Sequence, residues 1–152
     1  MILEALLAFA HISAVILLVV FLSAKTALLH VDVVAASGAT GAGPGWLARM
    51  RRLDQWTWVG FAAIAASGAA RVAWGAKGWH WYLANPLLWA KIALFVAMVA
   101  MAPGASRELA RWRGGQSDAD AQALRAHRKR LMWQAHLMVL IPLFGCLLAY
   151  GF

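Results

Sequence analysis

The sequence predicts an all-α integral membrane protein, a single transmembrane domain over residues 1–152 arranged as a four-helix bundle with up-down-up-down topology. Three observations support this prediction. Hydrophobic residues make up 63% of the chain, against about 45–50% in a typical soluble domain. Four apolar segments approach or exceed the length of about 20 helical residues that crosses a bilayer. The connections between them are rich in glycine, tryptophan or arginine, which are typical of turns and membrane surfaces.

The first predicted helix, residues 3–36, carries ionisable side chains in a largely apolar run. Four of them share one seven-residue register, which holds Glu4, His11, Leu18, Lys25 and Asp32. Seven residues of an α-helix fall only about 20° short of two full turns, so these side chains project from one side of the helix. Because an ionisable group in the bilayer core is costly unless it faces protein or water, this side is predicted to face the other helices. For Lys25 two interpretations stay open, a buried position or an amine that reaches the membrane surface.

The second predicted helix, residues 53–74, follows a glycine-rich turn at 37–45 and an interfacial stretch at 46–52. Small and polar residues recur three and four apart along it, as in a seam that faces a bundle. The seam consists of Thr57, Gly60, Ile64, Ser67 and Arg71. Its small residues favour close helix packing, and they would also leave clearance for a cofactor.

The third predicted helix, residues 86–102, opens with Pro86, whose missing N–H costs nothing at the first helical position. The connection at 75–85 is short and aromatic. Its tryptophans are typical anchors at a membrane surface, but so dense a set could also cover a planar ligand. The aromatic set consists of Trp74, Trp79, Trp81, Tyr82 and Trp89.

The fourth predicted helix covers residues 121–150. Asp118 and Asp120 favour a helix start in water just ahead of it, with entry into the membrane near Leu131. The lone Cys146 excludes an internal disulfide and is expected to be a small buried hydrophobe.

Charge predicts the orientation. The chain carries a formal net charge of +8, and its basic residues gather in the first and third connections, whereas the second holds Lys77 with Arg71 at its edge. The positive-inside rule therefore places the first and third connections in the cytoplasm and both termini in the periplasm of a bacterial inner membrane. Nucleic-acid binding is not expected, because topology already explains the basic residues and few aromatic residues accompany them.

Depth along the helices predicts which polar groups meet. A helix rises about 1.5 Å per residue, so His11 lies about 10 Å and Lys91 about 7–8 Å inside the outer surface. Arg71 ends the second helix near the same level. These three form a predicted outer polar layer, and His136 lies about 10 Å deeper than His11. The sequence leaves open whether His136 forms a second site with Gln134. Nearer the cytoplasmic edge, solvated positions are expected for His30, Lys25, Asp32, Asp54 and His127.

The outer polar layer has two interpretations. A neutral imidazole is the commonest protein ligand of haem iron, and Arg71 and Lys91 could pair with the porphyrin propionates. Alternatively, Glu4, Arg71 and Lys91 form an ion network that only fixes how the helices align.

The chain resembles an uncharacterised bacterial family of predicted four-helix membrane proteins over essentially its whole length. The resemblance rests on His11, the segments 71–78 (RVAWGAKG), 82–86 (YLANP) and 89–92 (WAKI), and the pair Ile141 and Pro142. No biochemical role comes with it.

More distantly, His11 and the segment Trp89-Ala-Lys91 are similar to HemJ-type protoporphyrinogen oxidases and to CopD-like membrane domains. The HemJ resemblance implies haem b in a four-helix bundle, with His11 as an axial iron ligand and Lys91 as a second ligand or site residue. Lys25 matches a basic residue late in the first HemJ helix only loosely, and residues 135–139 lack the family's Asn-Glu-x-x-Pro run.

The expected function is therefore haem b binding and electron transfer, with His11, Lys91, Arg71 and Glu4 around the porphyrin. The expected partners are the lipid bilayer and either a redox protein or further copies of the chain. The alternative is a non-enzymatic membrane protein whose polar layer is structural and which binds a partner subunit or lipid.

Overall fold

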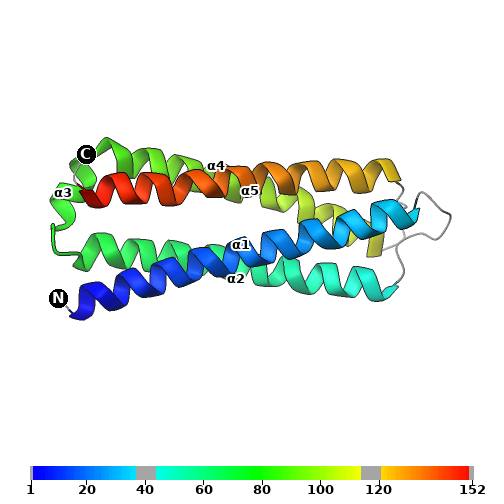
Figure 1. The fold of residues 1–152 in the computed structure, drawn as a ribbon, viewed down its shortest axis with the longest axis horizontal. Coiled ribbons are helices and arrows are strands. Elements are labelled where there is room, and N and C mark those ends of the chain that lie inside the picture. The colour runs from blue at the N-terminus through cyan, green and yellow to red at the C-terminus, as the bar shows by residue number, and fades with distance from the viewer. Residues whose placement is uncertain (1, 37–43, 114–120, 151–152) are drawn as a thin grey trace.

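The structure is a computed structural model that describes residues 2–36, 44–113 and 121–150. These residues form the helices α1 (Ile2–Ala36), α2 (Pro44–Trp74), α3 (Trp79–Ala84), α4 (Pro86–Arg113) and α5 (Ala121–Tyr150). The four long helices run side by side, and short α3 joins α2 to α4 at one end (Figure 1). The start of α1 and the end of α5 lie at this α3 end, and we call the opposite end of the bundle the far end.

The all-α prediction is confirmed over the described residues, but two helix boundaries were wrong. Helix α2 begins at Pro44, so the expected interfacial stretch at 46–52 is helical. Helix α4 continues through Pro103 to Arg113, although the sequence predicted an end at residue 102. A proline inside a helix removes one hydrogen bond, but buried residues continue at helical spacing beyond it. The buried residues beyond these two predicted boundaries are Trp46, Met50, Ala105 and Leu109.

Helix α3 lies within what was predicted to be a simple connection. Gly78 takes a φ of 77°, a left-handed conformation that glycine adopts without strain. Gly75 lies against Tyr82, since an added Cβ at residue 75 would approach the Tyr82 ring to 2.9 Å and the Arg71 carbonyl oxygen to 2.3 Å. The two glycines let the chain turn sharply and bring Tyr82 back over the end of α2.

Three helices in the described part of the chain are long and apolar enough to cross a membrane, over Ile2–Leu29 of α1, Pro86–Arg113 of α4 and Gln122–Leu148 of α5. Large apolar side chains face outward from the bundle, as lipid contact requires, and they include Phe9, Ile16, Val96, Val139 and Leu143. Helix α2 is not among the three, so a fourth span remains a prediction. Small residues and tryptophans make α2 less hydrophobic than its neighbours.

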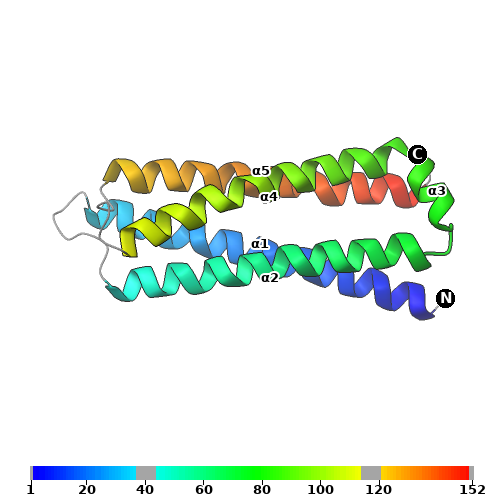
Figure 2. The same cartoon turned by 180° about the vertical axis from the view of Figure 1, so that it is seen from behind.

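The helices pack as two pairs. Helix α1 packs closely on α2 and on α5, and α4 packs on α5, whereas α2 and α4 share the loosest of these interfaces. Helix α4 runs obliquely and lies nearer to α2 at the far end than at the α3 end (Figure 2). The backbones of α2 and α4 are therefore farther apart at the α3 end than at the far end (Figure 2).

The predicted polar side of the first helix faces the interior. His11, Leu18 and Lys25 are buried, with exposed fractions of 5%, 0% and 2%. Glu4 is half-buried, and the side chains of His30 and Asp32 lie outside the described residues. Between His11 and Lys25 the bundle contains an apolar layer, which we define as Leu18, Leu22, Phe61, Met98 and Met138. This layer separates two polar groups at different depths.

Candidate functional site

A cavity of about 320 Å³ lies at the α3 end of the bundle, and all five helices contribute to its wall. Most of the lining is apolar, including Ile64, Val72, Leu88, Phe95 and Ile141. Four polar side chains also line it, His11, Arg71, Tyr82 and Lys91. A mostly apolar cavity with a few convergent polar groups is the usual form of a small-molecule site.

The hydrogen bonds of His11 indicate its tautomer. Its Nδ1 lies 2.9 Å from Ser67 Oγ, and Ser67 donates its hydroxyl hydrogen to the Ala63 carbonyl at 2.6 Å. Since a hydroxyl has only one hydrogen to give, Ser67 accepts from His11 and Nδ1 carries the proton. Nε2 of the neutral ring then holds a lone pair, which accepts a hydrogen bond from Lys91 Nζ at 3.4 Å.

Glycines make room for this pair. An added Cβ at Gly68 would lie 3.4 Å from Cε1 of His11, and one at Gly145 would lie 3.4 Å from Nζ of Lys91. Both side chains therefore occupy space that a larger residue on the facing helix would restrict. Gly68 of α2 and Gly145 of α5 thus leave space for the two side chains.

The cations at the cavity have no carboxylate partner in the described part of the chain. Among the described residues, neither Arg71 nor Lys91 forms an ion pair, and the ion pairs present are Lys25 with Asp54 and Glu108 with His127 and Arg130. Glu4 does not line the cavity, and the predicted network of Glu4, Arg71 and Lys91 does not form. Both side chains are half-buried, and even partial burial of a cation without a carboxylate partner is costly, so this arrangement favours an anionic ligand.

One aromatic residue of the second connection covers the cavity. Tyr82 lines it, whereas Trp74, Trp79 and Trp89 are exposed, as expected of membrane-surface anchors. Lys77 lies 4.0 Å from the Trp81 ring centroid and donates to the Leu148 carbonyl at 3.4 Å. These contacts tie the connection between α2 and α3 to the end of α5.

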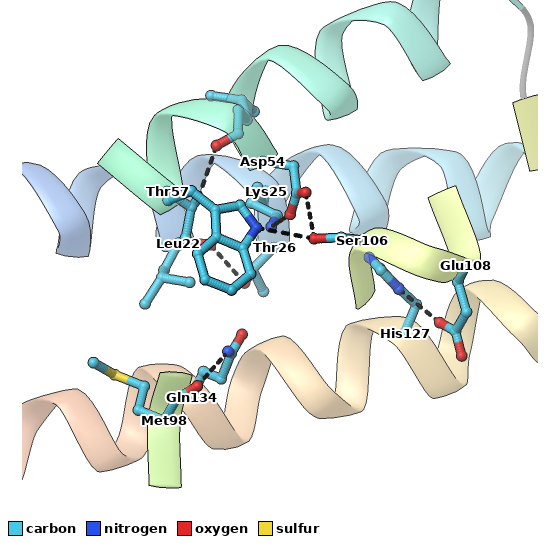
Figure 3. Close-up of polar contacts among 12 residues, drawn as sticks. Leu22, Lys25, Thr26, Asp54, Thr57, Met98, Ser106, Glu108, His127 and Gln134 are labelled. Atoms are coloured by element: carbon cyan, nitrogen blue, oxygen red, sulfur yellow. Dashed lines mark hydrogen bonds and ion pairs between the residues drawn. The ribbon is translucent and has the colours of Figure 1, made fainter. Parts of the chain in front are cut away.

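A second polar group lies in the far half of the bundle (Figure 3). Lys25 Nζ pairs with Asp54 Oδ1 at 2.6 Å, and Ser106 donates to Asp54 Oδ2 at 2.6 Å. Trp58 Nε1 donates to Ser106 at 3.1 Å. The prediction of solvated positions for Lys25 and Asp54 was wrong, since both are buried. The α2 seam held the missed signal, because Asp54 lies three residues before Thr57, one step beyond the seam's predicted start.

His127 is likewise buried, with an exposed fraction of 0%, and its predicted solvated position was wrong. Its Nδ1 lies 2.8 Å from Glu108 Oε2, and Arg130 pairs with the other oxygen of Glu108. Glu108 lies in the part of α4 beyond residue 102, which was not predicted to be helical. A helix that ended at residue 102, as predicted, would not have brought Glu108 to His127.

The remaining candidates do not form a site. His136 is exposed and bonds to the Met132 carbonyl of its own helix, whereas Gln134 is buried and donates to the Met98 carbonyl. They face different directions and do not combine. Cys146, predicted to be buried, is exposed. Among the described residues, no three His, Cys, Asp or Glu side chains are grouped to hold a metal ion.

Comparison with known proteins identifies a family. A family model described as a predicted membrane protein (DUF2214) matches residues 3–152. No curated protein and no solved structure matches the chain.

Proposed function

The chain belongs to the DUF2214 family of predicted membrane proteins, and from this premise we propose that it binds haem b in the cavity at the α3 end, through the imidazole of His11. The observation that carries the proposal is the unprotonated Nε2 of His11 at the cavity wall, which accepts a 3.4 Å hydrogen bond from Lys91 while Nδ1–H is donated to Ser67. A metal-binding histidine usually donates its other ring N–H in this way, which fixes the ring and its tautomer.

The polarity of the cavity supports the same ligand. A porphyrin is an apolar plate with two carboxylates, and the cavity offers an apolar wall with Arg71 and Lys91. Hydrogen bonds between such cations and carboxylates are about twice as strong as neutral ones. Glu4, which the sequence also assigned to the porphyrin surroundings, lies outside the cavity and has no part in the proposal.

Size sets a condition on binding. His11 Nε2 and Lys91 Nζ lie 3.4 Å apart, within hydrogen-bonding distance, which leaves no space for another atom between them. Lys91 must therefore move to admit iron, whether or not it becomes a second ligand. The volume of about 320 Å³ is near the lower end of the range of about 300–1,000 Å³ for ligand pockets. The loose packing of α2 on α4 supplies the side on which the cavity can widen.

The residues have separate roles under this proposal. Haem would supply one-electron chemistry, which protein side chains lack. His11 would bind the haem, and Ser67 holds the His11 ring in one tautomer. Arg71 and Lys91 compensate negative charge, and Tyr82 with the apolar wall excludes water. We assign electron transfer as the activity and a redox protein or a further copy of the chain as the partner, as the resemblance to HemJ-type oxidases implies.

We also propose the topology. Helix α2 completes a set of four spans, since it runs beside α1 along most of the bundle (Figure 1). The basic residues at the described edges of the far end favour a cytoplasmic position there, with the α3 end in the periplasm of a bacterial inner membrane. These residues are Arg49, Arg51, Arg52, Arg107, Arg111, Arg113, Arg125, Arg128, Lys129 and Arg130.

A second candidate function is non-enzymatic binding of an acidic lipid. The free cations Arg71 and Lys91 favour it, since a lipid headgroup would neutralise them, and a cavity of about 320 Å³ holds a headgroup without widening. Under this candidate, His11 is only a hydrogen-bonding wall residue.

An absorption spectrum separates the two candidates. Protein purified in detergent from cells supplied with a haem precursor should show a Soret band that disappears in His11→Ala and shifts in Lys91→Met. The matched control is His136→Ala, which removes an exposed histidine and should leave the band unchanged. A colourless wild-type protein, or a band that survives in His11→Ala, would contradict haem binding at this site. Copurifying acidic lipid in the colourless protein would support the second candidate.

A further inference from the structure

The buried polar residues in the far half of the bundle form two hydrogen-bonded chains, and Figure 3 shows the two chains beside each other. One consists of Lys25, Asp54 and Ser106 in the interior, and the other of His127, Glu108 and Arg130. The second chain reaches the surface, because the side chains of Glu108 and Arg130 are exposed by 26% and 46%. Among the residues that the structure describes, no hydrogen bond or ion pair joins the two chains.

His127 faces the gap with an unpartnered nitrogen. Its Nε2 is fully buried and has no hydrogen-bond partner among the described residues. Figure 3 shows the His127 ring between Glu108 and Ser106, and His127 interacts electrostatically with both Lys25 and Asp54. A buried polar atom without a partner costs about 1–3 kcal/mol, and in native proteins such an atom is usually satisfied by an ordered water.

The interior chain has donors for such a water. The Lys25 ammonium carries three N–H groups, and among the described residues it bonds only to Asp54. Both Asp54 oxygens already accept, one from Lys25 and one from Ser106. The groups facing His127 are thus Lys25 from α1, Asp54 from α2 and Glu108 from α4, with Lys25 as the donor that has hydrogens to spare.

We propose that a buried water accepts from Lys25 Nζ and donates to His127 Nε2, completing a proton path from Glu108 at the surface to the buried pair of Lys25 and Asp54. Ionisable residues inside membrane bundles commonly mark such paths. The ligand of this second site is therefore a single water molecule.

The transfer balances in both charge and atoms. A proton leaves the Lys25 ammonium for the water, the water gives one of its own protons to Nε2 of His127, and His127 releases its Nδ1 proton to Glu108. Glu108 passes the proton to solvent, leaving a neutral Lys25 amine and the Asp54 carboxylate. The reverse sequence restores the ammonium.

The path is separate from the cavity at the α3 end. Lys25 lies fourteen residues after His11 on α1, which corresponds to about 21 Å along the helix, and the apolar layer fills the space between them. No described polar side chain of α1 crosses this layer, so the path ends at Lys25 and Asp54. Through this path, the buried pair of Lys25 and Asp54 exchanges protons with solvent at the far end of the bundle. The path does not depend on haem.

Proton exchange of the Lys25 ammonium tests the path directly. The chain has only four lysines, so protein labelled with ¹⁵N-lysine in detergent micelles gives a simple spectrum in which the Lys25 signal is assigned by its loss in Lys25→Met. The path predicts that Lys25 exchanges with water despite its burial, and that His127→Gln slows this exchange by about tenfold or more because solvent then reaches Lys25 only by local opening. The matched control is His136→Gln, which changes an exposed histidine and should leave the rate unchanged.

The Lys25 chemical shift reports whether the pair with Asp54 survives in each variant. If His127→Gln does not fold, Glu108→Gln removes the next group in the path and should slow exchange in the same way. Equal Lys25 exchange rates in the wild type and in a folded His127→Gln or Glu108→Gln variant would overturn the proposal. So would wild-type exchange that occurs only on global unfolding.

Discussion

Lys25 Nζ and Asp54 Oδ1 are 2.6 Å apart inside the bundle, with side-chain exposed fractions of 2% and 11%. The two residues join α1 to α2 across 29 positions of sequence. A buried pair of this kind is a weak source of net stability, because the attraction only offsets the cost of removing both charges from water. Removing only one member of the pair is strongly destabilising, because the remaining charge is then buried alone.

Lys25→Met is therefore expected to lower the free energy of unfolding by about 3–5 kcal/mol, the usual cost of leaving one member of a buried pair. The double variant Lys25→Met with Asp54→Leu should recover most of this loss, because no charge then remains buried. Unfolding in detergent followed by circular dichroism measures both. A double variant no more stable than the single one would contradict the account.

Gly75→Ala is expected to destabilise the fold by about 1–3 kcal/mol, the usual cost of overpacking. The new Cβ would lie 2.3 Å from the Arg71 carbonyl oxygen, and the backbone cannot rotate away as a side chain can. Gly45→Ala is the matched control, because nothing lies within 4 Å of a Cβ there. The thermal unfolding midpoint should fall for Gly75→Ala and not for Gly45→Ala, and equal midpoints would refute the close approach of the Arg71 carbonyl oxygen to Gly75.

The polar side of the first helix could be predicted from the sequence because it depends only on helical periodicity. The seven-residue register placed His11 on the inner face, where it is buried, whereas it left Lys25 open between a buried position and the membrane surface. Depth counting likewise assigned His11, Arg71 and Lys91 to one level, and all three line one cavity. Such local rules succeed where a side chain's surroundings follow from its own helix.

The far half of the bundle could not be predicted, because it depends on where helices end. Pro103 favoured an end at residue 102, yet packing of Ala105 and Leu109 against the other helices keeps α4 helical to Arg113. That extension brings Ser106 and Glu108 to the buried groups of other helices. Tertiary packing that overrides a local helix-breaking signal is not visible in one sequence, and neither is the pairing of Lys25 with Asp54.

Ser67→Ala is expected to weaken haem binding by about 10–100-fold, the usual effect of removing the group that orients a metal-binding histidine. Without Ser67 Oγ, the Nδ1–H of His11 loses its acceptor and the ring is free to change tautomer. Haem titration of the purified protein, followed at the Soret band, measures the affinity. Ser106→Ala removes a serine from the far polar group and should leave the affinity unchanged. Equal affinities for Ser67→Ala and wild type would show that the tautomer is irrelevant.

Arg71→Gln tests whether the cavity recognises negative charge. If Arg71 pairs with a propionate, wild-type protein should prefer haem over its dimethyl ester, since a hydrogen bond between charged groups contributes about 1.5–3 kcal/mol, or about 10–100-fold in affinity. Arg71→Gln should lose most of that preference by weakening haem binding, while binding of the uncharged ester stays nearly constant. Lys77 lies at the same end but does not line the cavity, so Lys77→Gln is the matched control and should keep the preference. Competition titrations of the two porphyrins measure it, and an equal preference in Arg71→Gln and wild type would mean that the carboxylates do not reach Arg71.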